Sequence, residues 1–326
     1  MSFARQSRSA NLIKWVGTLL SVVLLIYLLS QQDWQNVLQA LTRIPFWRFA
    51  VAFLLMFVSR FAVASRWYVL LRVVSNKVSW MQSVRWTFSG LFATNFLPTT
   101  IGGDIVRLAG GVQSGLEAAM TTASLVTDRL VGMLGMALML PFGIVPLFGW
   151  FSTQNAIGGV SVIPEFSLVS GAGLKKIWHK VIEFARKTFQ SIKLWLKQPA
   201  SLLYSFLFTG IHMLCFFSIF SILLGGLNDS ISYSAVAGLY SFVYLVTLLP
   251  ISINGYGLQE LSISVIFSEV GGVSLQNSLT MALIFRTMTM LASLPGVFFL
   301  PSIISGNKNE ADSQENGPSF DEDIDP

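Results

Sequence analysis

The chain has 326 residues, of which 53% are hydrophobic and only 11% are charged, and its mean hydropathy is +0.64. Because soluble globular domains are about 25% charged, this composition excludes an ordinary soluble protein and indicates a membrane as the solvent. The formal net charge is +5, with most charges at the termini and in one internal segment. Cys215 is the only cysteine and lies in an apolar run, which excludes a disulfide framework and predicts a packing role.

Several apolar stretches reach the about 18 to 20 residues that cross a hydrocarbon core. They cover residues 12–29, 46–71, 121–150, 199–226, 231–250 and 278–301. The first one follows basic residues, as in a signal peptide, but "SQQDW" after it contains no small-residue cleavage site, so we expect a retained helix. The fold class that follows is an all-α, polytopic helical membrane protein, with residues 1–304 forming a single transmembrane domain.

Two of the apolar regions are interrupted in a similar way. "LPTTIGGDIVRL" begins at Leu97 and "LPISINGYGLQEL" begins at Leu249, and each reads Leu-Pro, four residues, Gly. Matching interruptions in two halves of a membrane protein are typical of transporters built from internal repeats, with the site near the bilayer midplane. We therefore expect two broken or re-entrant helices and an internal repeat. The residues expected to break the helices are Pro98, Gly102, Gly103, Pro250, Gly255 and Gly257.

The remaining segments bear on topology. The helix expected over 121–150 should end or kink near Pro141 or Pro146. Residues 151–174 are too polar for a confident span, whereas residues 175–197 are strongly basic with helical spacing, which predicts an amphipathic helix on the membrane surface. Residues 305–326 are acidic, a composition that favours disorder.

Basic residues predict which segments face the cytoplasm. They place the N-terminus and the 175–197 helix on the cytoplasmic side of a plasma (inner) membrane. This arrangement requires either the interrupted region 83–112 or residues 151–174 to cross, and the sequence does not decide between them.

Charged residues inside the apolar stretches are the candidate site, because each costs about 2.5 to 3.5 kcal/mol at the bilayer centre. We expect Arg107 to pair with Asp128, and Arg286 with Glu260. Arg60 is a less secure candidate. The candidate substrate-binding residues are Asn95, Asp104, Arg107, Asp128, Arg129, Glu260 and Arg286.

Three further residues receive an expectation of their own. Asp128 and Arg129 are adjacent, so each should find its partner on a different helix. Arg66 is expected to extend to the interface near Arg72. His212 is expected to be a packing residue in its apolar helix rather than a proton relay.

Several functions are excluded or disfavoured by what the sequence lacks. It contains no phosphate-loop motif, no zinc-protease motif and only two histidines, so we expect no cofactor, no metal and no catalytic residue. Nothing in it indicates nucleic-acid binding, and it does not indicate the oligomeric state.

Three motifs together, "ATNFLPTTIGGDIVRL", "SLVTDRLVGML" and "LPISINGYGLQE", resemble the lysylphosphatidylglycerol synthase transmembrane-region family over about residues 10 to 304. The resemblance implies a flippase-like domain with re-entrant helices around a central cavity, and transfer of a modified phospholipid between leaflets. The soluble aminoacyl-transferase half is absent, so lysine transfer from tRNA is not expected. The family's motif positions correspond here to Asn95, Pro98, Gly102, Gly103, Asp104, Arg107, Asp128, Arg129, Gly255, Gly257 and Glu260.

Three function classes follow. The first is a lipid transporter in which arginines and half-helix ends bind an anionic or lipid-linked phosphate headgroup and the acids orient those arginines. The second is a membrane-embedded subunit of a lipid-modifying or lipid-linked glycosyl transfer enzyme, with Asp104 or Glu260 as base. The third is a scaffold that recruits a partner enzyme on the cytoplasmic face, which the intramembrane charges make least favoured.

Overall fold

The structure is a computed structural model, and it describes residues 44–96, 102–143, 146–147, 195–248, 257–301 and 303. The first apolar stretch, residues 151–174, most of the basic 175–197 segment and the acidic tail lie outside the described residues. The described helices are α3 (Phe46–Val74), α4 (Trp80–Phe96), α5 (Gly102–Gln113), α6 (Ala118–Met139), α9 (Pro199–Gly226), α10 (Tyr233–Thr247), α11 (Leu258–Val265), the short π-helix η3 (Ile266–Val270) and α12 (Leu275–Ser293).

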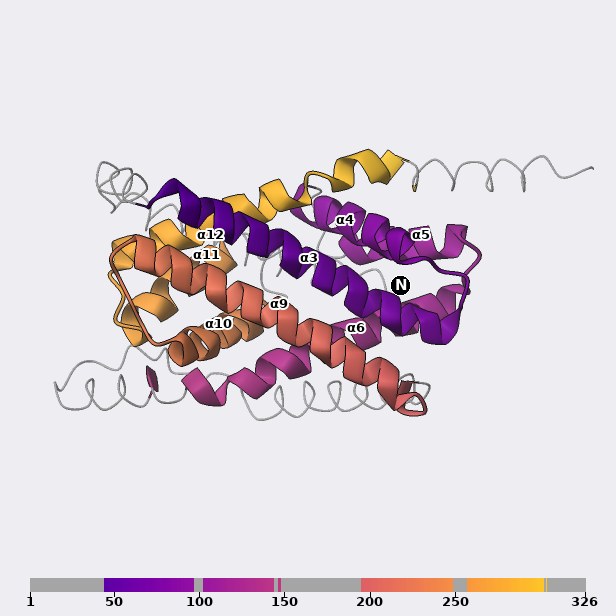
Figure 1. Ribbon diagram of the computed structural model, residues 1–326, viewed down its shortest axis with the longest axis horizontal. Coiled ribbons are helices and arrows are strands. Elements are labelled where there is room, and N and C mark those ends of the chain that lie inside the picture. The colour runs from indigo at the N-terminus through magenta and orange to yellow at the C-terminus, as the bar shows by residue number, and fades with distance from the viewer. Residues whose placement is uncertain are drawn as a thin grey trace, which may run out of the picture.

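Two long helices, α3 and α9, lie side by side across the whole bundle (Figure 1). Arg48 near the start of α3 donates to the carbonyl of Ile222 near the end of α9, at 3.3 Å. At the opposite end, Trp195 just before α9 donates to the carbonyl of Leu70 near the end of α3, at 3.1 Å. The two helices are therefore antiparallel.

Helices α4 and α5 form a hairpin beside the end of α3, and glycines allow their close contact. A Cβ atom on Gly90 would lie 2.7 Å from the carbonyl oxygen of Gly103, and one on Gly110 would lie 2.4 Å from the ring of Trp86, so both positions require glycine. Trp86 precedes Gly90 in α4, whereas its partner Gly110 follows Gly103 in α5, so the two helices are antiparallel. At 12 residues, α5 is about 18 Å long and too short for a hydrocarbon core of about 30 Å.

The expected re-entrant helix is thus confirmed in the first half. The sequence left open whether region 83–112 or residues 151–174 cross, and the return of α5 along α4 argues against the first alternative. Helix α6 ends at one end of the bundle and α9 begins at the other (Figure 1). Residues 151–174, on which the second alternative depends, lie outside the described residues.

The second half repeats this order. After α9 come the shorter helices α10 and α11 with η3, and then α12. Figure 1 shows α4 and α5 at one end of the bundle and α10 and α11 at the other. Each half is a long helix, a pair of shorter helices and a second long helix, and the two pairs enter from opposite ends. An internal repeat was expected from the matching interruptions, and the element order agrees with it.

The two halves also contact each other in equivalent ways. Gly143, just after α6, lies against the backbone of Gly238 in α10. Gly296, just after α12, lies against the backbone of Phe88 in α4, and its carbonyl accepts a hydrogen bond from Ser89 at 3.4 Å. The long helix that follows each hairpin therefore packs on the first hairpin helix of the other half.

The core of the described residues is apolar and rich in aromatic rings. Phe220 lies 4.8 Å from Phe285 and 4.7 Å from Tyr240 between ring centroids, joining α9, α10 and α12. Cys215 is buried in α9, in agreement with a packing role. Helix α6 ends just before Pro141, as expected from the proline.

Three of the described helices are long and apolar enough to cross a membrane. They are Phe46–Val74, Ala118–Gly143 and Pro199–Gly226. Together with the absence of strands among the described residues, they confirm an all-α, polytopic membrane fold.

Candidate functional site

Five charged side chains from α3, α5 and α6 meet in the first half of the bundle. We call them the central charge cluster, which comprises Arg66, Asp104, Arg107, Asp128 and Arg129. Three arginines face two aspartates, which leaves an excess of one positive charge. Since each charge is costly within a bilayer, their pairing is what makes this arrangement tolerable.

Asp128 on α6 is the centre of this cluster. Its Oδ1 accepts from Nε of Arg66 at 2.7 Å, and its Oδ2 accepts from Nη2 of Arg107 at 3.1 Å. The Asp128 side chain is 2% exposed, and the two arginine side chains are 9% and 10% exposed. A buried carboxylate that uses both oxygens on two guanidinium groups is well compensated for its loss of water. The expected pair of Arg107 and Asp128 forms.

Arg66 does not lie where the sequence suggested. It was expected to extend to the interface, but it is buried and points toward α6. Gly132, one turn after Asp128, leaves the room for this: a Cβ there would lie 2.9 Å from Nη1 of Arg66. The same nitrogen lies 3.4 Å from Oγ1 of Thr209 on α9. The feature of the sequence that indicates a buried Arg66 is the small residue Gly132. It can be recognised only once α3 and α6 are known to lie side by side.

Arg107 is fixed from a second direction by an aromatic ring. Its guanidinium carbon lies 4.1 Å from the ring centroid of Trp67 on α3, a cation–π contact. The indole nitrogen of Trp67 donates to Oγ of Ser124 at 3.1 Å, which fixes the ring. The face of this arginine is therefore held rigidly, because both its partner carboxylate and its stacking surface are buried.

Arg129 and Asp104 form the accessible edge of the cluster. Nε of Arg129 lies 2.6 Å from Oδ2 of Asp104, and Arg107 reaches the other oxygen of Asp104 at 3.7 Å. The Arg129 side chain is 56% exposed and that of Asp104 is 22% exposed. The expectation that Asp128 and Arg129 each find a partner on another helix than their own is confirmed, since Asp128 binds Arg66 of α3 and Arg107 of α5, and Arg129 binds Asp104 of α5.

A second charge pair lies in the other half. Nε of Arg286 on α12 lies 3.1 Å from Oε1 of Glu260 on α11, with the two side chains 12% and 5% exposed. Nη1 of Arg286 also donates to Oε1 of Gln259 at 3.2 Å. The expected pair of Arg286 and Glu260 therefore forms as well.

The two halves place their charge pairs at equivalent positions. Asp104 is the third residue of α5, and Glu260 is the third residue of α11. Their arginine partners, Arg129 and Arg286, are each the twelfth residue of the next long helix. A carboxylate in the first turn of a helix is stabilised by the partial positive charge of that terminus, which explains why the acid rather than the arginine follows the interruption.

The expected helix-breaking residues are only partly as predicted. Gly102 and Gly103 belong to the first turn of α5, and they are buried there. The lack of a side chain at Gly103 serves the close approach of α4, because a Cβ there would lie 2.7 Å from the carbonyl oxygen of Gly90. Gly257 does precede a helix, with φ of +74° at the start of α11, a conformation that favours glycine. Pro98, Pro250 and Gly255 lie outside the described residues.

Three other residues complete the picture. Asn95 is buried near the end of α4. The ring nitrogen Nδ1 of His212 lies 2.6 Å from Oγ of Ser59, and its ring lies 4.3 Å from that of Phe216, in agreement with a packing role. Within the described residues, no group of three or more histidine, cysteine or acidic side chains could hold a metal ion.

The comparisons with known proteins agree with the motifs. The family model described as "Lysylphosphatidylglycerol synthase TM region" matches residues 14–296, close to the range over which the resemblance was expected. Among curated proteins, no match to the chain is found.

Proposed function

The chain belongs to the lysylphosphatidylglycerol synthase transmembrane-region family, and from this premise we propose that it binds a phosphate-containing lipid and moves it between the leaflets of the membrane. The family suggests a membrane protein related to lipid modification or flipping. This substrate is either an anionic phospholipid or a lipid-linked molecule that contains phosphate. The proposal includes a plasma-membrane location with a cytoplasmic N-terminus.

The observation that carries the proposal is the central charge cluster, which lies beside a helical hairpin inside a membrane bundle. A bundle held together by apolar packing does not require five charged side chains, each of which costs about 2.5 to 3.5 kcal/mol at the bilayer centre. Two hairpins that enter from opposite ends are also typical of transporters with a site at the repeat interface.

The arginines differ in how far they are available to a ligand. Arg107 is buried against Asp128, whereas Arg129 is 56% exposed and is held by Asp104. We assign the first contact with a lipid phosphate to Arg129, and further contacts to Arg107 and Arg286. Guanidinium groups suit this role because they present paired donors that match phosphate oxygens. The acids orient the arginines.

Translocation can be measured in proteoliposomes that contain phospholipids with a fluorescent headgroup, by adding dithionite, which reduces only the fluorophores it reaches. Wild-type protein should allow quenching beyond the outer-leaflet fraction seen in empty vesicles. Arg129→Gln should return quenching to that fraction. Arg72→Gln is the matched control, because Arg72 is exposed in the last turn of α3, outside the cluster.

If wild-type vesicles matched empty vesicles for every lipid tested, energy-independent translocation of those lipids would be excluded. If Arg129→Gln behaved as wild type, the site assignment would be wrong while translocation would stand.

One observation favours the alternative of a membrane-embedded enzyme subunit. Oε2 of Glu260 is buried and has no hydrogen-bond partner among the described residues, so this oxygen could act as a base on a lipid-linked substrate. Product formation by purified protein, lost in Glu260→Gln, would support this function. A Glu260→Gln variant that still formed product would exclude Glu260 as the base.

A further inference from the structure

Arg60 is a charged residue that belongs neither to the central charge cluster nor to the pair of Arg286 and Glu260. It lies in the middle of the 29-residue helix α3, which is one of the membrane-spanning candidates. No described carboxylate forms an ion pair with it. Among the arginines within the membrane part of the bundle, it thus differs from Arg66, Arg107 and Arg286, which each have an acidic partner.

The surroundings of Arg60 hold its guanidinium group without satisfying it. Nη2 lies 3.4 Å from Sδ of Met56, and sulfur is only a weak acceptor. The guanidinium carbon lies 5.3 Å from the ring centroid of Phe216 on α9. The side chain is half-buried, so its remaining donors stay accessible to an anion.

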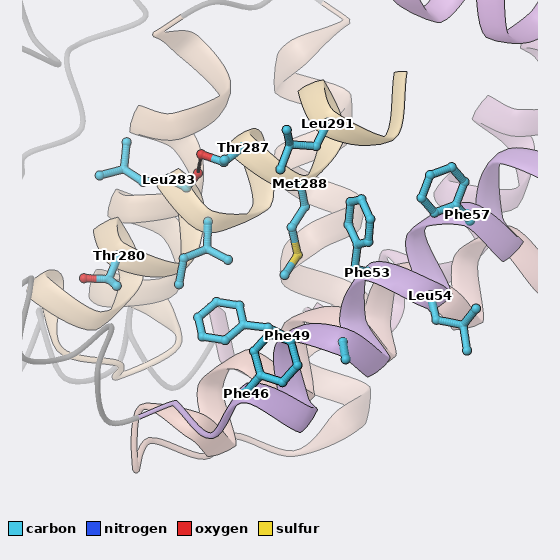
Figure 2. A pocket seen from close by; sticks show the side chains of 12 residues that line it. Phe46, Phe49, Phe53, Leu54, Phe57, Thr280, Leu283, Thr287, Met288 and Leu291 are labelled. Atoms are coloured by element: carbon cyan, nitrogen blue, oxygen red, sulfur yellow. Dashed lines mark hydrogen bonds between the residues drawn. The ribbon is translucent and has the colours of Figure 1, made fainter. Parts of the chain in front are cut away.

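An apolar groove runs between α3 and α12, close to this arginine. It has a volume of about 710 Å³. Figure 2 shows the side chains that line it. Phenylalanines of α3 form one wall and aliphatic side chains of α12 form the other, with two threonines as the polar exceptions. Several lining residues are strongly exposed, among them Phe46 at 83% and Leu54 at 64%, so the groove opens toward the surroundings of the bundle.

The groove and Arg60 share one face of α3. Phe49, Phe53, Phe57 and Arg60 follow one another at spacings of four, four and three residues, which places them along one side of a helix. Arg60 is about 4.5 Å further along the helix axis than Phe57. The stacking partner of Arg60, Phe216, also contacts Phe285 on α12 at 5.2 Å between centroids.

We propose that this groove holds an acyl chain of an anionic phospholipid whose phosphate is bound by Arg60. The proposal rests on the proposed function and names a binding site for its substrate. The lining of the apolar groove reaches Phe57, one turn before Arg60, and an apolar groove beside a cation that forms no described ion pair is complementary to a molecule with an apolar chain and an anionic head. Electrostatic complementarity of this kind selects the charge of the headgroup, and the groove contributes affinity that does not depend on the headgroup.

The test is a binding measurement on full-length protein in detergent, with phosphatidylglycerol and phosphatidylcholine that carry the same fluorescent acyl chain. Wild-type protein should bind phosphatidylglycerol at least about tenfold more tightly, as expected for one charge-assisted contact. Arg60→Gln should remove this preference, whereas Arg72→Gln, on the same helix but exposed at its end, should keep it. Thr287→Trp adds bulk at an exposed position of the groove and should weaken binding of both lipids equally.

Each result bears on one part of the proposal. An unchanged preference in Arg60→Gln would overturn the role of Arg60, and unchanged binding of both lipids by Thr287→Trp would overturn the role of the groove. Binding that depends on Arg60 without any translocation in vesicles would reject the proposed function and leave this site standing. Translocation by wild type with normal binding by both variants would reject this site alone.

Discussion

Replacing Asp128 by asparagine should destabilise the protein more than any other single loss of charge in the bundle. The amide keeps the shape of the side chain and one acceptor oxygen, but it places an N–H group opposite one of two guanidinium groups. Arg66, 9% exposed, would then be buried without an anionic partner, and Arg107, 10% exposed, would keep only Asp104, at 3.7 Å. Removing one member of a buried ion pair costs about 3 to 5 kcal/mol.

The measurement is thermal unfolding of purified protein in detergent, followed by tryptophan fluorescence. At about 2 °C per kcal/mol, expected for long chains, the midpoint of Asp128→Asn should fall by roughly 6 to 10 °C. Glu117→Gln is the control, because Glu117 is exposed at the start of the same helix and makes no side-chain cap. Adding Arg66→Gln to Asp128→Asn should recover part of the loss, since the cluster then holds one cation fewer. Equal midpoints for Asp128→Asn and Glu117→Gln would show that the buried pairing contributes no stability.

The remaining predictions concern helix packing and the second charge pair. Gly90→Ala should lower the unfolding free energy by about 1 to 3 kcal/mol in denaturant titrations, because the new methyl group would lie 2.7 Å from the carbonyl of Gly103. Gly210→Ala should instead raise it by about 0.5 to 1 kcal/mol, since a Cβ there meets nothing within 4 Å; a loss like that of Gly90→Ala would contradict the packing. Glu260→Gln should lower the thermal midpoint, and Glu260→Arg combined with Arg286→Glu should restore most of it, which independent effects of the two residues would not do.

The helices could be predicted from the sequence wherever a long apolar run has clear ends. The stretch 199–226 matches α9 residue for residue, because proline begins it and a glycine pair ends it. The stretch 46–71 corresponds to α3, which continues to Val74. Local composition suffices here because the membrane demands a continuous hydrogen-bonded helix wherever the chain is apolar.

The interrupted regions were less predictable because their geometry depends on neighbouring helices. The sequence indicated a broken or re-entrant helix near Pro98, but it did not decide between the two or indicate the contacts along which the chain returns. That return depends on Gly90 and Gly110, which allow the two helices to touch. The packing role of Gly103 was not predicted for the same reason, because a glycine needed for close packing looks the same in the sequence as a glycine needed for a turn.

The charge pairs, too, could be predicted from the sequence only in part. The pair of Arg107 and Asp128 could be predicted from the free-energy cost of a charge within a bilayer, because both residues lie in apolar sequence and each needs a partner of opposite charge. Arg66 was misplaced because long basic side chains near helix ends can extend to the interface, and only the contact with Gly132 distinguishes the two outcomes.

The excess of positive charge lies entirely in the first half, although the two halves share their architecture. Each half has an acid at the third residue of its second hairpin helix and an arginine at the twelfth residue of the next long helix, so these two pairs belong to the repeated framework. Arg66, Arg107 and Asp128 have no such counterparts among the described residues of α9, α11 and α12, and neither does Arg60. A framework that only had to fold would need the repeated pairs and nothing more. The additional cations of α3 and α5 therefore distinguish one half chemically, and an anion that entered between the halves would be attracted toward α3.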